Sequence, residues 1–137
     1  MKKIYIISFC CILLYGCEIF TVGGKRISRP QIEANQKSPI GTIYLFKSEL
    51  DSNNVPAAIR LMMRPSGYPY LALEKLELYD ELSRIQRIIY NKPITDFKSD
   101  SLSEHSYKLN IEFDYLKTIT FVTAKFDESW YIVNLSD

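Results

Sequence analysis

The spacing of apolar residues changes once along the chain, near Asn91. Before this point apolar residues recur every three or four positions, which is typical of a helix with one buried face. After it, apolar and polar residues alternate, which is typical of strands with one face in water. The pattern therefore predicts two or three helices followed by an antiparallel sheet, which is an α+β fold class.

Two helices are expected at the start of this pattern. Ser38-Pro39 favours a helix start, because the serine side chain can accept a hydrogen bond from a free amide and proline has no amide hydrogen. The polar residues 51–54 favour the end of this helix. Asn54 can in turn cap a second, short helix that carries Pro56 near its beginning.

The longest regular element is expected over residues 70–90. Apolar residues fall on one face of this helix: Leu71, Leu78, Leu82, Ile85 and Ile89, widened by Ala72, Leu76 and Tyr79. Asp80 and Arg84 have the spacing of a favourable ion pair on a helix. Four acidic residues crowd the first half, and we interpret them as a solvated face because no histidine accompanies them.

Four strands are expected in the second part of the chain. A short strand over residues 94–99 would be followed by a hairpin loop over residues 100–104. Residues 107–113 alternate cleanly, which predicts a strand with one wet face. Residues 116–126 have apolar side chains on both faces and favour a central strand, and residues 130–135 would pair back as the last strand.

The first residues have the pattern of an export signal. Met1-Lys2-Lys3 is followed by an apolar run over residues 4–14, which as a helix would span about 16 Å, against a hydrocarbon core of about 30 Å. The run ends in Leu14-Tyr15-Gly16-Cys17, which resembles the lipobox of a bacterial lipoprotein signal, with Tyr15 bulkier than usual. The resemblance implies diacylglycerol on Cys17, cleavage after Gly16, and anchoring to a membrane of the cell envelope with the domain outside the cytoplasm. An ordinary cleaved signal and a buried N-terminal strand are the alternatives.

This signal divides the chain into three expected parts: a signal peptide over residues 1–16, a lipid-attached flexible tether over residues 17–37, and a single α+β domain over residues 38–137. The tether contains Gly23-Gly24 and Pro30, which disfavour regular structure. Its basic residues suit either anionic lipid headgroups or a solvated linker. The only cysteines are Cys10, Cys11 and Cys17, so the sequence offers the domain no disulfide and no thiol.

The order of elements resembles NTF2-like domains, and more narrowly the small NTF2-like (cystatin-like) lipoproteins of unknown function. The features that carry this resemblance are the helix from Ser38, the segment Asn54-Val55-Pro56-Ala57-Ala58 and the final hairpin of residues 125–132. The resemblance covers residues 38–137. It implies a curved antiparallel sheet that wraps the long helix to form a cone, which holds a pocket in some members and only core in others.

The chain offers few candidates for catalysis. Its only histidine, His105, lies beside the expected hairpin loop, and no second histidine is present for a dyad or a metal site. Helix or strand periodicity places most of the acidic side chains in water. It does so least clearly for Asp96 and Asp114, and either of these could act alone if it lay at a concave position. We therefore expect no catalytic residue, no metal and no cofactor.

Aromatic residues are the other candidates. Trp130, Tyr79, Tyr107 and Tyr131 suit either the lining of a ligand pocket or core packing with a hydroxyl in water. Basic and acidic residues are nearly balanced, which disfavours nucleic acid as a partner. We expect a membrane-anchored lipoprotein with a non-catalytic binding or envelope-assembly role, whose partner is a protein or a small apolar ligand. The alternatives are an NTF2-like enzyme acting on a small apolar substrate, and an inhibitor or immunity-type protein of an envelope enzyme. An enzyme would need a buried cluster of polar groups, whereas an inhibitor would need an exposed apolar patch or an edge strand.

Overall fold

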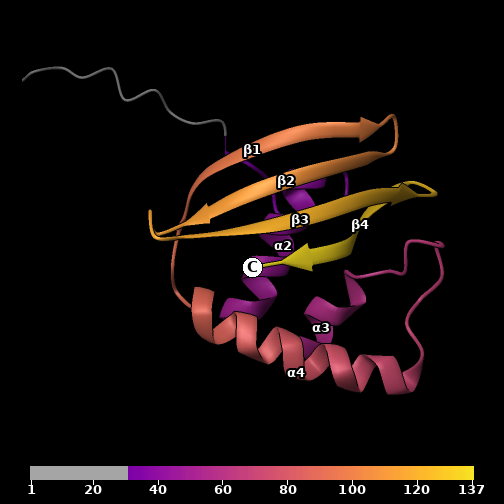
Figure 1. Cartoon of the computed structure of the whole chain (residues 1–137), viewed down its shortest axis with the longest axis horizontal. Helices are drawn as coiled ribbons and strands as arrows, with labels where there is room; N and C mark the ends of the chain where they lie inside the picture. The colour runs from indigo at the N-terminus through magenta and orange to yellow at the C-terminus, as the bar shows by residue number, and fades with distance from the viewer. Residues whose placement is uncertain (1–30) are drawn as a thin grey trace, which may run out of the picture. The chain divides into compact units, whose positions relative to one another are not determined.

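The computed structural model describes residues 31–137, so the predicted signal and Cys17 lie outside the described residues. Within this range, three helices precede the sheet: α2 (Pro39–Asp51), α3 (Val55–Arg60) and α4 (Ala72–Ile89). Four strands follow: β1 (Ile94–Ser103), β2 (Ser106–Phe113), β3 (Lys117–Phe126) and β4 (Ser129–Ser136). They form one antiparallel sheet in the order β1-β2-β3-β4, which curves and does not close (Figure 1). The predicted α+β fold, with helices packed on a curved antiparallel sheet, is confirmed.

The first two helices begin where their capping residues predict. The Ser38 hydroxyl oxygen accepts a hydrogen bond from the Gly41 amide at 3.0 Å, at the start of α2. The Asn54 side chain accepts from the Ala57 amide at 3.3 Å, at the start of α3. Both caps satisfy amides that have no partner inside the helix.

The sheet follows the predicted alternation, with one correction in its first strand. Residues 100–103 belong to β1, and the hairpin turn contains only Glu104 and His105. The polar composition of residues 100–103 favoured a loop, but these residues pair with β2, and Asp100 lies opposite Lys108. Backbone pairing across the hairpin therefore lengthens β1 beyond its apolar segment.

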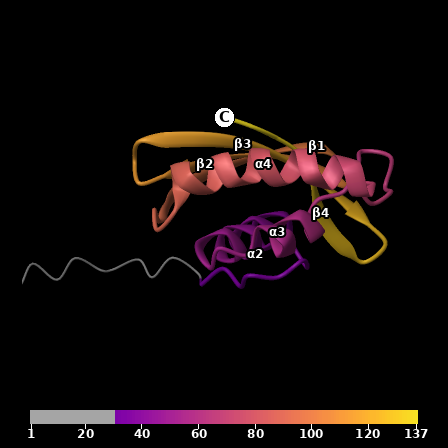
Figure 2. The ribbon, with the colours of Figure 1, turned by 90° about the horizontal axis from the view of Figure 1, so that it is seen from below.

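The core lies between the inner face of the sheet and the helices. Figure 2 shows α2 and α3 together on one side of the sheet. The rings of Phe46 on α2 and Phe121 on β3 meet edge to face, with centroids 5.9 Å apart. The other strand residues of this core are Leu109, Ile111, Phe113, Ile119 and Ile132. The opposite face of β2 carries Lys108, which is exposed, and Asn110 and Glu112, which are half-buried, as the alternation predicts.

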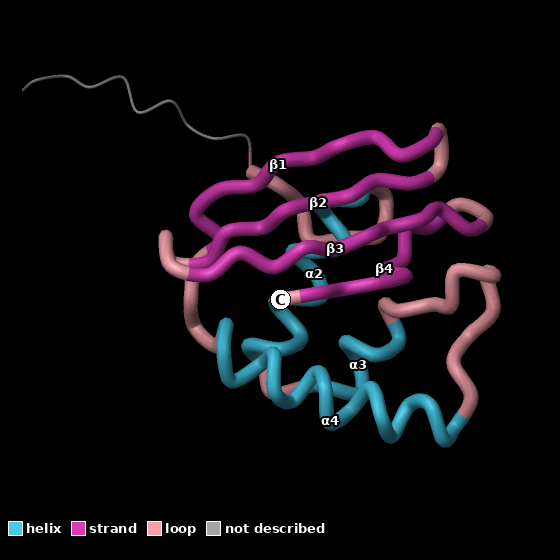
Figure 3. The backbone as a smooth tube through the Cα atoms, in the orientation of Figure 1, coloured by secondary structure: helices cyan, strands magenta, loops and turns pink. Residues whose placement is uncertain are grey.

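The two edges of the sheet differ. At the β4 edge, the Ile132 amide donates to the Leu61 carbonyl, and the Met63 amide donates to the Ile132 carbonyl, both at 2.9 Å. The Trp130 amide donates to the carbonyl of Gln36, which falls within the expected tether, also at 2.9 Å. At the other edge, β1 has no neighbouring strand within the part of the chain that the structure describes (Figure 3).

Candidate binding surfaces

A cleft of about 410 Å³ opens between the beginning of α2 and the inner face of β1 and β2. Its lining is mainly apolar and aromatic: Ile40, Phe97, Tyr107, Leu109 and Trp130, with Pro39, Lys37 and two serines at the rim. The Tyr107 and Trp130 rings meet edge to face, with centroids 5.5 Å apart. This arrangement suits a small apolar or aromatic ligand, because such rings offer apolar area with a defined orientation.

Of the four aromatic residues that the sequence singled out, only Tyr107 and Trp130 lie together at this cleft. Tyr131 points away from Trp130 by strand alternation, and its ring lies 6.2 Å from that of Phe126. Tyr79 lies on α4, at a different depression. Two strand residues that the sequence did not single out, Phe97 and Leu109, also line the cleft. The register between β1 and β2 places both of them on the inner face of the sheet, and this register was not predictable from either strand alone.

The acids and the histidine named from the sequence lie elsewhere. Asp96 is exposed and borders a shallow hollow on the outer face of the sheet, beside Lys98 and Glu112. Asp114 sits in the β2–β3 turn with a φ of 53°, and His105 is exposed in the β1–β2 turn. Within residues 31–137, no three His, Cys, Asp or Glu side chains come together in a group that could hold a metal ion. Asp96, Asp114 and His105 are therefore not among the residues that line the cleft beside Trp130.

A second candidate surface lies on the first half of α4 and the loop before it. We call it the α4 apolar surface and define it by five exposed side chains: Tyr68, Leu71, Leu73, Leu76 and Tyr79. Leu71, Leu73 and Leu76 expose 63%, 71% and 66% of their area, whereas Leu82, Ile85 and Ile89 in the second half are fully buried. The expectation that Leu71, Leu76 and Tyr79 belong to the buried face is therefore wrong.

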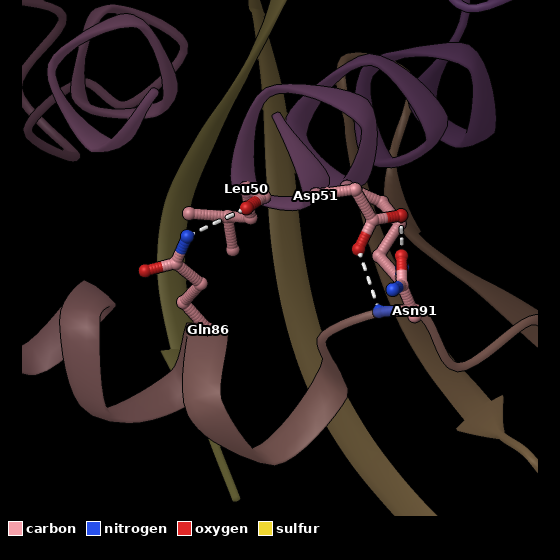
Figure 4. Close-up of polar contacts among 5 residues, drawn as sticks. Leu50, Asp51, Gln86 and Asn91 are labelled. Carbon is pink, nitrogen blue, oxygen red and sulfur yellow. Dashed lines mark hydrogen bonds and ion pairs between the residues drawn. The ribbon is translucent and has the colours of Figure 1, made fainter. Parts of the chain in front are cut away.

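The cause is the position of α4 relative to its neighbours. In Figure 1, α4 runs below the sheet beside the short α3. Its second half is held to the end of α2: the Gln86 side chain donates to the Leu50 carbonyl at 2.7 Å, and the Asn91 amide donates to the Asp51 carboxylate at 3.1 Å (Figure 4). The first half lies beside α3 and the loop that carries Arg64. Between these two helices lies a groove of about 360 Å³, which Leu76 and Tyr79 border together with Ile59.

The start of α4 is held by charge. The Arg64 guanidinium binds the Glu74 carboxylate, which also accepts a hydrogen bond from the Leu71 amide at 2.7 Å. The hydrogen bond from Arg64 is the main reason why the pKa of Glu74 lies below its ordinary value, and the bond from the Leu71 amide lowers it further. Tyr70 is partly buried beside them, and this burial raises its pKa.

The acids beside the α4 apolar surface have no partner of this kind. Glu77, Asp80 and Glu81 are exposed and take part in none of the ion pairs among residues 31–137. The predicted pair of Asp80 with Arg84 is wrong, because the Arg84 guanidinium binds the Asp137 carboxylate at 2.8 Å. Exposed leucines and tyrosines therefore lie near these acids, and the basic residues Arg60 and Lys75 line the groove beside Leu76 and Tyr79.

Sequence reasoning missed this surface because it assigned Leu71, Leu76 and Tyr79 to the same helical face as Leu82, Ile85 and Ile89. The one available signal was Leu73, which lies outside that period. No family model matches this chain, and a search of curated proteins found no match. None of the helices within residues 31–137 is long and apolar enough to cross a membrane.

Proposed function

We propose that this chain is a membrane-anchored lipoprotein of the bacterial cell envelope whose domain binds another protein and performs no catalysis. The α4 apolar surface carries the binding part of this proposal. Five large apolar side chains within twelve residues are exposed there, and two of them, Leu76 and Tyr79, share a groove with Ile59. Exposed apolar surface that is rimmed by polar residues marks interaction sites. Tyrosine, present here as Tyr68 and Tyr79, is also enriched among the residues that dominate binding energy at interfaces.

The charges beside the surface suggest the chemistry of the partner. Glu77 and Asp80 lie one helical turn after Leu73 and Leu76, and both acids are exposed. A partner segment with an apolar anchor flanked by lysine or arginine would match this arrangement. Complementary charge of this kind speeds association and disfavours other partners.

The anchor of the proposal rests on Leu14-Tyr15-Gly16-Cys17 and the apolar run before it. Replacing Cys17 by serine should abolish labelling with a fatty-acid analogue and stop maturation, because the thioether has no sulfur on which to form. Cys11→Ser is the matched control and should still be labelled. Labelling of Cys17→Ser, with an unchanged mature mass, would contradict the anchor.

The binding role is tested by placing a photo-crosslinking residue at Leu73 in the intact cell, with Thr118, exposed on the outer face of β3, as the control position. We expect an adduct with one protein from position 73 and none from position 118. The same adduct should form with the purified partner and weaken with Leu76→Ala and with added salt. Equal adducts from both positions, or none from position 73, would overturn the binding role.

Inhibition of an envelope enzyme is the second candidate function. It needs an exposed apolar patch or an edge strand, and residues 31–137 present both, at α4 and at β1. The purified partner distinguishes the two roles: loss of its enzymatic activity in the complex favours inhibition, and unchanged activity favours assembly. The resemblance to NTF2-like (cystatin-like) lipoproteins agrees with the order of three helices and four antiparallel strands, and we retain membership of that group as part of the proposal.

A further inference from the structure

The open edge of β1 is the most unusual feature of the sheet. The opposite edge, at β4, is covered by residues 61–63 and by Gln36. Within residues 31–137, the backbone hydrogen bonds outside the sheet ladders include none to residues 96–101 of β1. An uncovered edge of this length is a template for another strand unless charges or bulges prevent the pairing.

The side chains of β1 divide cleanly between the two faces. Asp96, Lys98 and Asp100 lie opposite Glu112, Asn110 and Lys108 on the outer face, whereas Phe97, Ser99 and Ser101 lie opposite Ile111, Leu109 and Tyr107 on the inner face. The beginning of α2 faces this part of the inner face across the cleft, and Phe97 remains 38% exposed. Lys98 and Asp100 take part in none of the ion pairs among residues 31–137.

The bulges of β1 leave a regular segment between them. Register shifts occur between Ile94 and Asp96 and between Ser101 and Ser103, so residues 96–101 are evenly paired. An antiparallel strand added to this segment could therefore form a regular ladder over these residues.

The charge pattern of this segment is complementary to itself. When a two-fold axis relates two antiparallel strands of one sheet, one residue must face its own copy. With Ser99 at that position, Lys98 of each copy faces Asp100 of the other. With Lys98 at that position, the two lysines would face each other and Asp96 would face Asp100, which is unfavourable. With Phe97 at that position, Asp96 would face Lys98, but only residues 96–98 of the regular segment would pair, against residues 97–101 with Ser99.

We propose that two copies of this chain pair through β1, antiparallel, with Ser99 of one copy facing Ser99 of the other. The pairing joins the two sheets into one continuous sheet. It places Ser101 of the second copy beside the half-exposed Phe97, and it pairs the outward backbone groups of residues 97–101 in both copies. The interface is small, so the dimer is a weak one that forms at high protein concentration.

Cross-linking tests the register. The full chain, purified in detergent with Cys10, Cys11 and Cys17 replaced by serine, carries a single cysteine in place of Ser99, Ser101 or Thr118. Under a mild oxidant, we expect Ser99→Cys to form a disulfide-linked dimer at least about tenfold faster than the other two variants, because directly opposed residues have Cβ atoms about 5 Å apart. Equal rates for the three variants, or no dimer from Ser99→Cys, would overturn the pairing.

A charge exchange tests the same contact without a covalent bond. Lys98→Glu places a glutamate opposite Asp100 twice in the dimer, and should weaken dimerisation in sedimentation experiments by roughly tenfold. The double variant Lys98→Glu, Asp100→Lys restores opposite charges and should recover the original dimer. The thermal midpoint of each variant checks that the monomer still folds. A chain that stays monomeric at all concentrations, or a double variant as weak as the single one, would refute the proposal.

Discussion

Replacing Leu82 and Leu76 by alanine, one at a time, compares two leucines of the same helix that the sequence pattern treats alike. Leu82 is fully buried, whereas Leu76 is 66% exposed. The two substitutions remove the same atoms from the same kind of backbone. Any difference between them therefore reports where α4 is covered.

The structure sets the size of this difference. A buried leucine replaced by alanine costs about 2–5 kcal/mol, because its transfer energy is lost and a cavity remains. Leu76 keeps about a third of its area buried, so its loss costs less than about 1 kcal/mol. The higher helix propensity of alanine offsets a few tenths of a kcal/mol of that cost. We therefore expect Leu82→Ala to lower the thermal midpoint by roughly 8–20 °C and Leu76→Ala by only about 2 °C.

Urea denaturation followed by tryptophan fluorescence measures both free energies. Trp130 is the only tryptophan, and it is buried beside Tyr107, so its emission changes on unfolding. An equal loss of stability in the two variants would show that the first half of α4 is covered in the folded protein. The α4 apolar surface would then be unavailable to a partner, and the proposed function would lose its main support.

Two further predictions use the same fluorescence assay. Gly41→Ala should lower the free energy of unfolding by about 1–3 kcal/mol. The reason is that the added Cβ would lie 2.8 Å from both the Asn35 carbonyl oxygen and the Ser38 hydroxyl. An unchanged free energy of unfolding would mean that Asn35 does not pack on α2. The second prediction concerns pH. The hydrogen bond from Arg84 lowers the pKa of Asp137 below its ordinary value of 3.8. The contact therefore contributes its full stabilisation above pH 3.8, and this stabilisation is lost as the pH falls through the lowered pKa. Asp137→Asn should therefore reduce the urea midpoint at pH 7, and its difference from the unsubstituted chain should shrink as the pH falls below 3.8 and through the lowered pKa. A difference that stays constant as the pH is lowered would contradict the contact.

The helix starts and the strands could be predicted from the sequence because they depend on local interactions. Ser38 and Asn54 cap helices through amides only three residues away, so their roles depend on nearby sequence and not on the fold. The alternation of residues 107–113 was equally informative, because successive side chains of a strand point to opposite faces wherever the strand lies. The α+β class followed from these two kinds of signal.

Only the tertiary structure decided which parts of those elements are covered. Leu71 and Leu82 share a helical face, yet one is exposed and the other fully buried, because α2 meets only the second half of α4. Arg84 binds Asp137, 53 residues away, in place of its neighbour Asp80. Helical period cannot specify such contacts, since it describes one element without its neighbours.

The same reason separates the candidate sites. The stretch Leu14-Tyr15-Gly16-Cys17, which resembles a lipobox, is contiguous, so lipid attachment at Cys17 is a prediction from the sequence alone. The cleft at Tyr107 and Trp130, the α4 apolar surface and the open edge of β1 each depend on how distant segments pack. Covering an apolar face or a strand edge requires a second element, and its position is a property of the folded chain and not of the local sequence.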